Sequence, residues 1–161
     1  MRYLIRQKYF AIKDRYTIFD DANQPCFQVE GRLFSFGKKL TIFDLQGNEI
    51  YFLKQRFINP FGRFDIFKGE ERVGTLKGRL SFFVKRYKVE GVWGSLKVRG
   101  GVFGFNWKIF NKENKALVAS LSKKILQIAD TYVIDVVDDN YDQAILVAIG
   151  ILIDAIHHKG R

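Results

Sequence analysis

The sequence has few of the residues from which cross-links, metal sites and membrane spans are built. Only one of its 161 residues is cysteine, which excludes an intrachain disulfide and a cysteine-based zinc site. Its two histidines, His157 and His158, are adjacent and would point about 100° apart on a helix, so they cannot both coordinate one metal ion. The longest apolar run, 144–153, is half the roughly 20 residues of a spanning helix. Residues 1–6 contain no apolar signal core, so we expect a cytoplasmic protein.

What the sequence does contain is typical of a β protein. Hydrophobic residues make up 47% of the chain, which excludes intrinsic disorder, and 16 residues are phenylalanine. Glycine occurs 14 times and proline only twice. Many aromatic residues combined with many glycines favour strands joined by tight turns. The length is that of one domain, which we assign to residues 1–161.

A short motif repeats along the chain. Thr-Ile-Phe-Asp at 17–20 recurs at 41–44, and further Ile-Phe pairs stand at 66–67 and 109–110. Each pair is followed by a polar turn and then by another extended segment. This regular spacing predicts a mainly β fold, in which residues 1–137 form an antiparallel β-barrel of about twelve strands.

The last part of the chain has a different pattern. Acidic and amide side chains at 138–142 favour a helix start, and apolar residues then cover every face. We predict a buried C-terminal hydrophobic α-helix from about Tyr141 to His157, threaded through the barrel, with residues 138–161 forming this helix and a tail. Small residues such as Gly150 are expected where the wall comes close. The residues expected to fill the barrel are Ile145, Leu146, Ile149, Leu152 and Ile153, with Asp154 as a buried carboxylate that needs a partner.

This order of elements resembles the LURP-one-related family of the tubby C-terminal-like superfamily. The segments that carry the resemblance are 3–10, the Ile-Phe-Asp turns, 29–31, 34–40, 122–124, 130–133 and the apolar helix with Asp154. The resemblance implies a twelve-stranded barrel around a central helix, and it implies neither an enzyme nor a cofactor. Tubby domains bind phosphoinositide headgroups and phospholipid scramblases look like distant relatives, so the resemblance also points to membranes. No lipid-binding residue of tubby matches this sequence.

Two segments come close to known ligand-binding motifs. Five residues separate Gly31 from Gly37 where a phosphate loop has four, and Lys39 stands where that loop has Ser or Thr. Asp138, Asn140 and Asp142 fit positions 1, 3 and 5 of a calcium loop, but Gln143 and Ile149 replace its required Gly and Glu. We therefore interpret 138–142 as a capped helix start and keep calcium as a weak candidate. No nucleophile elbow occurs, so we predict no catalytic residue and no cofactor.

Positive charge is concentrated in one stretch of the chain. The sequence carries 27 Lys and Arg against 17 Asp and Glu, a net charge of +10, and residues 72–99 hold eight basic residues against one acidic residue. Side chains two apart share a strand face, so basic pairs on three consecutive strands would lie side by side if their faces match. The candidate residues for an anionic ligand are Arg72, Lys77, Arg79, Arg86, Lys88, Lys97 and Arg99.

Two hypotheses about partners remain open at this point. The first is a monomeric, peripheral protein that binds anionic phospholipid at the membrane surface, with Trp93 at the interface. The second is a soluble interaction or regulatory scaffold with a protein partner. Basic side chains on strands also discourage aggregation, so the charge alone does not decide. We do not expect nucleic-acid binding, because the sequence has no aromatic-studded recognition motif and no basic helix.

Overall fold

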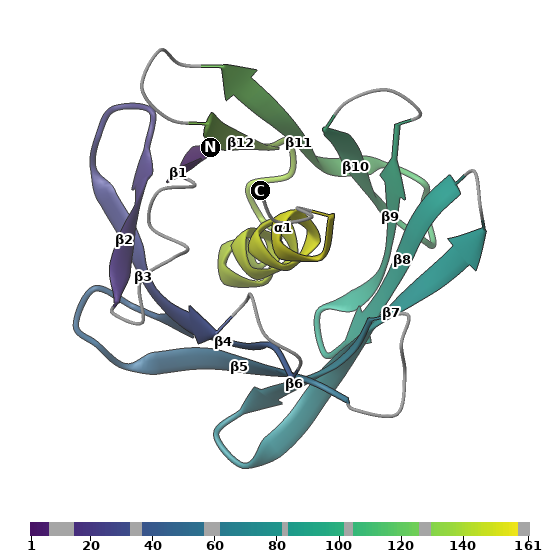
Figure 1. The fold of residues 1–161 in the computed structure, drawn as a ribbon, viewed down its shortest axis with the longest axis horizontal. Helices are drawn as coiled ribbons and strands as arrows, with labels where there is room; N and C mark the ends of the chain where they lie inside the picture. Colours follow the sequence, from purple (N-terminus) through teal and green to yellow (C-terminus); the bar gives the residue numbers. More distant parts are fainter. Residues whose placement is uncertain are drawn as a thin grey trace.

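The computed structural model describes residues 1–6, 15–32, 37–56, 62–81, 84–101, 105–125 and 130–157, without the side chains at 79–81, 84, 125 and 130. Within these ranges lie twelve strands and one helix (Figure 1). Each strand is antiparallel to its sequence neighbours, and β1 (Arg2–Arg6) pairs with β12 (Asp130–Val136) to close a barrel. The predicted fold class is therefore confirmed.

The other elements follow in chain order around the barrel. They are β2 (Tyr16–Asp20), β3 (Pro25–Arg32), β4 (Lys39–Phe43), β5 (Glu49–Gln55), β6 (Arg63–Lys68), β7 (Glu71–Ser81), β8 (Val84–Gly91), β9 (Gly94–Gly100), β10 (Asn106–Asn111), β11 (Leu117–Ile125) and α1 (Gln143–His157).

The repeated Ile-Phe pairs coincide with a repeated irregularity of the strands. The pairing register shifts between Ile and Phe at 18–19, 42–43, 66–67 and 109–110. Each of these isoleucines is at most 1% exposed, so it points into the barrel. A bulge at this point increases the local twist and bends the strand. The sequence repeat is thus a repeated bulge just before a hairpin.

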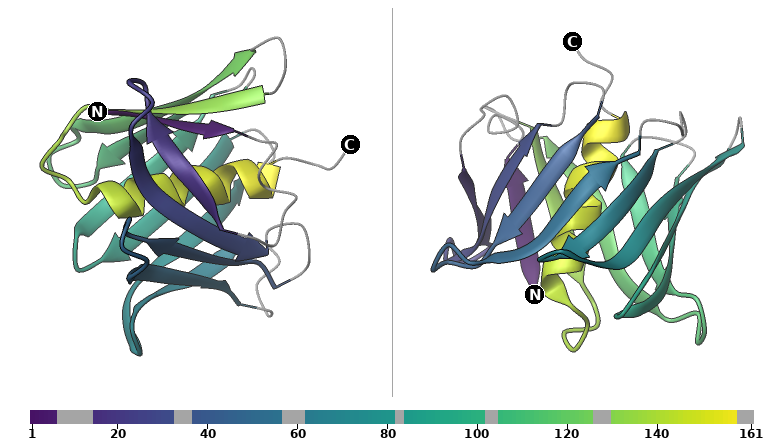
Figure 2. Two further views of the ribbon diagram at one scale, coloured as in Figure 1. Left: turned by 90° about the vertical axis from the view of Figure 1, so that its left-hand side faces the viewer. Right: turned by 90° about the horizontal axis from the view of Figure 1, so that it is seen from below.

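The polar residues after these pairs close the hairpins. The backbone N–H of Gln24 donates to Asp20 Oδ1 over 2.7 Å, and that of Asn48 donates to Asp44 Oδ1 over 2.8 Å. Gly47 has φ of 84°, which a residue with a side chain rarely adopts. Since strands alternate in direction, these hairpins and the start of α1 lie at one end of the barrel, which we call the turn end (Figure 2).

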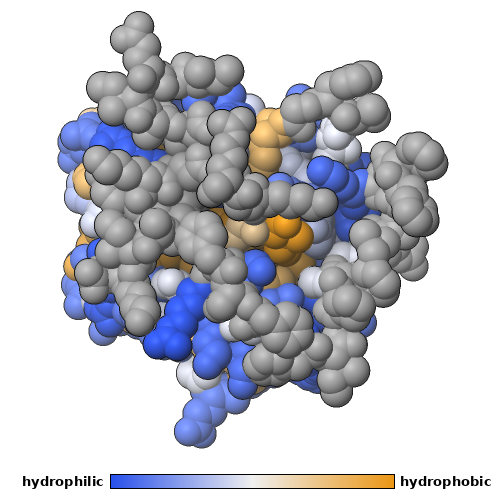
Figure 3. All heavy atoms as spheres, in the orientation of Figure 1, coloured by the Kyte–Doolittle hydropathy of each residue, from blue (hydrophilic) through white to orange (hydrophobic). Residues whose placement is uncertain are grey.

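The helix runs lengthwise through the barrel (Figure 2). Asp142 Oδ1 accepts a hydrogen bond from the Ile145 N–H over 3.2 Å, so Asp142 is the N-cap and the helix begins two residues later than predicted. Its 15 residues span about 22 Å, and every residue from 144 to 154 is buried. Seen from the end where α1 finishes, apolar residues lie at the centre and hydrophilic ones around the outside (Figure 3).

The helix packs tightly against the wall at Gly150. A Cβ placed there would be 2.5 Å from Ile134 Cδ1 on β12 and 3.1 Å from Leu121 Cδ2 on β11. A glycine therefore lets the helix approach these two strands without displacing their side chains. Around it, the core-filling residues of the helix are all 0% exposed, namely Ile145, Leu146, Ile149, Leu152 and Ile153.

Candidate anion-binding surface

The strand register brings basic residues opposite one another on the outer wall. Arg63 on β6 is paired with Lys77 on β7, Lys77 with Lys88 on β8, and Lys88 with Lys97 on β9. Four adjacent strands thus carry a continuous row of cations. Like charges directly opposite each other are unfavourable in a sheet, so packing alone gives no reason for this row.

A second row lies two residues further along the same strands. Arg86 on β8 is paired with Arg99 on β9, and Arg99 with Lys108 on β10. On β7, the backbone of Arg79 lies opposite that of Arg86, but the Arg79 side chain is outside the described part of the structure. We call the described members of the two rows the cationic band: Arg63, Lys77, Lys88, Lys97, Arg86, Arg99 and Lys108.

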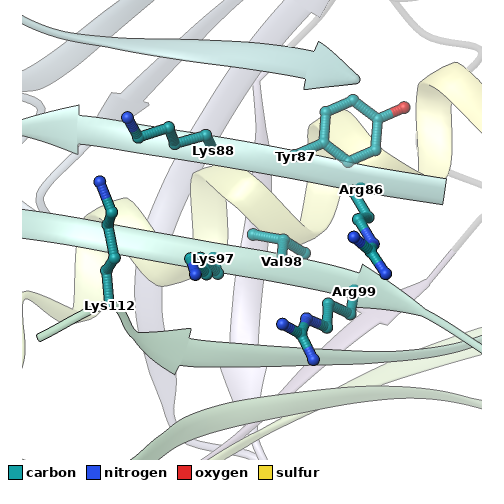
Figure 4. A pocket seen from close by; sticks show the side chains of 7 residues that line it. All are labelled: Arg86, Tyr87, Lys88, Lys97, Val98, Arg99 and Lys112. Carbon is teal, nitrogen blue, oxygen red and sulfur yellow. The ribbon is translucent and has the colours of Figure 1, made fainter. Parts of the chain in front are cut away.

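A groove of about 220 Å³ lies within this band (Figure 4). Tyr87 and Val98 line its base and are buried, since they point to the inner side of β8 and β9. Five cationic side chains from β8, β9 and the turn after β10 surround it, and among the residues that the structure describes no carboxylate lines it. These five residues, the groove cations, are Arg86, Lys88, Lys97, Arg99 and Lys112.

The carboxylate of Glu90 lies beside the groove. Glu90 Oε1 is 2.5 Å from Lys88 Nζ, and this contact holds the pKa of Glu90 below its usual value. The proximity of Lys88 also lowers the pKa of Lys112, and the Glu90 charge offsets only part of this effect. The single charge of Glu90 therefore offsets only part of the charge of the five groove cations, which leaves a local excess of positive charge.

Sequence reasoning identified part of this surface. Of the seven predicted residues, four are groove cations, and Lys77 adjoins them in the first row. Arg72 is not a groove cation. Its Nη1 lies 3.9 Å from Asp65 Oδ1 on β6 instead. The prediction missed Lys112, which follows β10 and lies outside the basic stretch 72–99. The backbone N–H of Lys112 donates to the Ser95 carbonyl on β9 over 2.9 Å, so the pairing of β10 with β9 continues past Asn111 and places Lys112 beside β9.

Comparison with known proteins identifies the chain's relatives. The model of a family described as LURP-one-related matches residues 1–154. The chain belongs to this family. It is 28% identical to the uncharacterised protein YxjI of Bacillus subtilis strain 168 over 152 residues, which cover 94% of this chain and 91% of YxjI. An X-ray structure of an Arabidopsis thaliana protein superposes with a TM-score of 0.63 over 96% of this chain and 90% of that one; at 19% identity it shares the fold.

The buried aspartate of this LURP-one-related chain lies in the last turns of α1. Asp154 is 3% exposed, so it faces the barrel interior. Tyr16 on β2 lies near it: burial, and then the negative charge of Asp154, raise the pKa of the Tyr16 hydroxyl. The phenol consequently stays protonated beside the carboxylate. In the described part of the chain, no helix has both the length and the apolarity needed to cross a bilayer.

The end of the helix is held by an aromatic cluster. His157 Nε2 lies 2.7 Å from the hydroxyl of Tyr87, and its ring centroid is 4.7 Å from that of Trp107. Burial, together with the positive charge of Lys85, lowers the pKa of His157 to about 4. His157 is thus neutral at pH 7 and contributes no positive charge to the helix C-terminus.

The acidic segment serves the start of the helix. Besides capping α1, Asp142 accepts a hydrogen bond from the Tyr51 hydroxyl through Oδ2 over 2.5 Å. Asp138 Oδ1 accepts the Asn140 N–H over 3.1 Å, and Asp139 Oδ1 lies 3.0 Å from the Met1 amino group. Among the described residues, no group of three His, Cys, Asp or Glu side chains is arranged to hold a metal ion.

Trp93 does not lie on the outer wall, which corrects the prediction of an interfacial tryptophan. Its indole ring covers two glycines that face each other across β7 and β8: a Cβ at Gly74 or Gly91 would come within 2.6 Å of the ring. Trp93 also packs edge-on against Tyr51 at a centroid distance of 5.6 Å. It therefore packs against the core at the turn end of the barrel.

Proposed function

We propose that this LURP-one-related barrel is a non-catalytic binding protein whose cationic groove holds anionic phospholipid headgroups at a membrane surface. The observation that carries the proposal is the groove itself, whose described lining holds five cations and no carboxylate. A bound phosphate would relieve the repulsion between residues such as Arg86 and Arg99, which face each other across β8 and β9. Binding would thus remove an unfavourable feature of the free protein.

The charge of the groove is sufficient for reversible membrane association. A basic residue near an anionic membrane contributes about 1 kcal/mol, so five groove cations would supply roughly 5 kcal/mol if they act independently. That energy falls with added salt, because the cations are on the surface and are screened. We therefore expect binding that depends on both lipid charge and ionic strength.

Two side chains of types that often act in catalysis, His157 and Cys26, are engaged in structural contacts, which supports binding over catalysis. His157 is a neutral partner of Tyr87 inside the barrel. Cys26 is half-buried, its Sγ lies 3.4 Å from the Gln24 carbonyl oxygen, and burial raises the pKa of its thiol. A raised pKa keeps the thiol protonated and a poor nucleophile.

Co-sedimentation with vesicles tests the proposal. The wild type should sediment with phosphatidylcholine vesicles that also contain phosphatidylserine or a phosphoinositide, and not with phosphatidylcholine alone. The double variant Lys97→Glu, Arg99→Glu should lose this binding, since removing even two cations weakens it by roughly 30-fold at about 1 kcal/mol each.

The matched control makes the same charge change elsewhere. Arg6 on β1 and Lys68 at the end of β6 are exposed and are not groove cations, so the double variant Arg6→Glu, Lys68→Glu should retain most of the binding. Equal loss in both double variants would point to net charge instead of the groove. A folded wild type that binds no anionic vesicle would contradict the proposal.

A second candidate function, a scaffold for a protein partner, is favoured by the turn end. Val92 is 72% exposed and borders a hollow of about 280 Å³, which Trp93 and Tyr141 also line. The carboxylate of Asp142 also lines this hollow and the charge of Asp138 lies near Tyr141, so a basic partner would suit it. A protein that is retained by the wild type and lost with Val92→Asp, while vesicle binding stays unchanged, would favour this function.

A further inference from the structure

A second groove lies on another part of the outer wall, across β3, β4 and β5. It has a volume of about 320 Å³. These strands are several positions around the barrel from β8 and β9, so the two grooves are separate (Figure 1). The residues that line the second groove are Glu30, Gly31, Arg32, Lys39, Thr41 and Phe52.

One side of this groove is a row of cations. Arg32 on β3 is paired with Lys39 on β4, and Lys39 with Lys54 on β5. All three side chains are exposed, and within the described part of the chain none of them forms an ion pair. The next residue in the row is Asp65, whose Oδ2 already lies 2.5 Å from Arg56 Nε. Three like charges in a row without a carboxylate between them fit a phosphate group.

The adjacent row of the sheet provides an aromatic surface. Phe52 on β5 is paired with Thr41 on one side and with Phe67 on the other, and the two phenyl rings are 6.3 Å apart. Phe52 lies on the outer wall, is half-buried and lines the groove. A half-buried ring beside a groove offers a flat face on which a planar group can stack.

The far end of the aromatic row carries hydrogen-bonding groups. Glu30 is paired with Thr41, so a carboxylate and a hydroxyl follow the ring of Phe52 in one line. Arg15 Nε lies 3.3 Å from Glu30 Oε2 and holds this carboxylate in place. A carboxylate repels phosphate but accepts hydrogen bonds from an amino group or a sugar hydroxyl.

The two rows are two residues apart along the strands, which is about 7 Å. A nucleotide has its planar base and its phosphates separated on this scale, with donor groups on the base and the ribose. We propose that the second groove binds a nucleotide, with the base on Phe52, its donors toward Glu30 and Thr41, and the phosphates on Arg32, Lys39 and Lys54. This mode differs from a phosphate loop, because Gly31 and Lys39 lie on paired strands and the cations act through side chains.

Isothermal titration with three probes separates the parts of this ligand. The wild type should bind ATP more tightly than either adenosine or inorganic tripolyphosphate. Phe52→Leu should weaken ATP binding at least about fivefold, the lower limit for losing one stacked base, and leave tripolyphosphate binding unchanged. The double variant Lys39→Gln, Lys54→Gln should weaken ATP and tripolyphosphate alike.

Two further variants keep the test decisive. Phe52→Trp retains an aromatic ring, so it should still bind ATP, and ATP should quench its added fluorescence relative to wild type. Lys97→Gln, in the other groove, should leave ATP binding intact while it weakens vesicle binding, so failure of one proposal can be told from failure of the other. Equal affinity for ATP and tripolyphosphate, no effect of Phe52→Leu, or no ATP binding by folded wild type would each overturn the nucleotide site.

Discussion

The interior of the barrel and its cationic band use alternate residues of the same strands in opposite ways. On β8, Tyr87 and Val89 point inward and are 7% and 0% exposed, whereas Arg86 and Lys88 point outward. Inside, apolar neighbours pack against α1, and each contact favours the folded state. Outside, cations face cations, and their repulsion disfavours the folded state. The difference indicates that stability is concentrated in the interior, and it is one basis for our proposal that the band serves binding.

Removing the helix is the strongest test of this division. Deletion of residues 141–161 would take away α1, whose residues 144–154 are all buried, and would expose the apolar inner face of the barrel. We expect the truncated chain to fail to fold, which circular dichroism and a thermal scan would show as the loss of a cooperative transition. A truncated chain that remains cooperative and β-rich would mean that the barrel does not need its helix.

A single interior substitution compared with a single band substitution measures the difference. Leu152→Ala should lower the free energy of unfolding by about 2–5 kcal/mol, because Leu152 is 0% exposed and its removal leaves a cavity. Lys97 is exposed, so Lys97→Ala should change the free energy of unfolding by no more than about 0.5 kcal/mol. Urea denaturation provides both values, and equal costs would contradict the contrast between interior and band.

The interior was more predictable from sequence than the band. Ile18, Ile42 and Ile66 repeat at fixed spacing, and this spacing was enough to count the strands, since a meander pairs each strand with the next. The band depends on which residues face each other across neighbouring strands. At one of these pairs, Arg63 with Lys77, the bulge between Ile66 and Phe67 shifts the register by one residue relative to an uninterrupted hairpin. Lys108 and Lys112 lie far from the basic stretch in sequence, so only the closed sheet brings them to it.

Trp93 illustrates a different limit of sequence reasoning. A tryptophan within a basic stretch suggested a membrane interface, but Gly74 and Gly91 leave a space that its ring covers. Gly74 lies 19 residues before Trp93, and the two glycines face each other only once β7 and β8 are paired. The position of the Trp93 ring is therefore determined by tertiary packing and not by any local sequence pattern.

The pH dependence of stability tests the C-terminal end of α1, where His157 lies. The pKa of His157 falls from 6.5 to about 4 on folding, so between these values the unfolded chain binds more protons at this site than the folded chain. This contribution to stability is therefore present at pH 7 and is lost as pH falls from about 6.5 toward 4. We expect the melting temperature of wild type to drop more steeply over this range than that of His157→Gln. Parallel profiles would indicate that His157 titrates normally in the folded protein.

The smallest effect is expected at the acidic segment of the turn end. Asp142 uses one carboxylate oxygen to cap α1 and the other to accept from Tyr51, while Asp138 accepts the Asn140 N–H. Calcium would have to displace these bonds, and loss of an N-cap alone costs about 1 kcal/mol. Thermal scans in millimolar calcium and in a chelator should therefore coincide. If calcium bound here, a concentration of 100 times its dissociation constant would add about 2.7 kcal/mol of stability and raise the melting temperature by several degrees. Loss of that rise in Asp138→Asn would establish a calcium site at this segment.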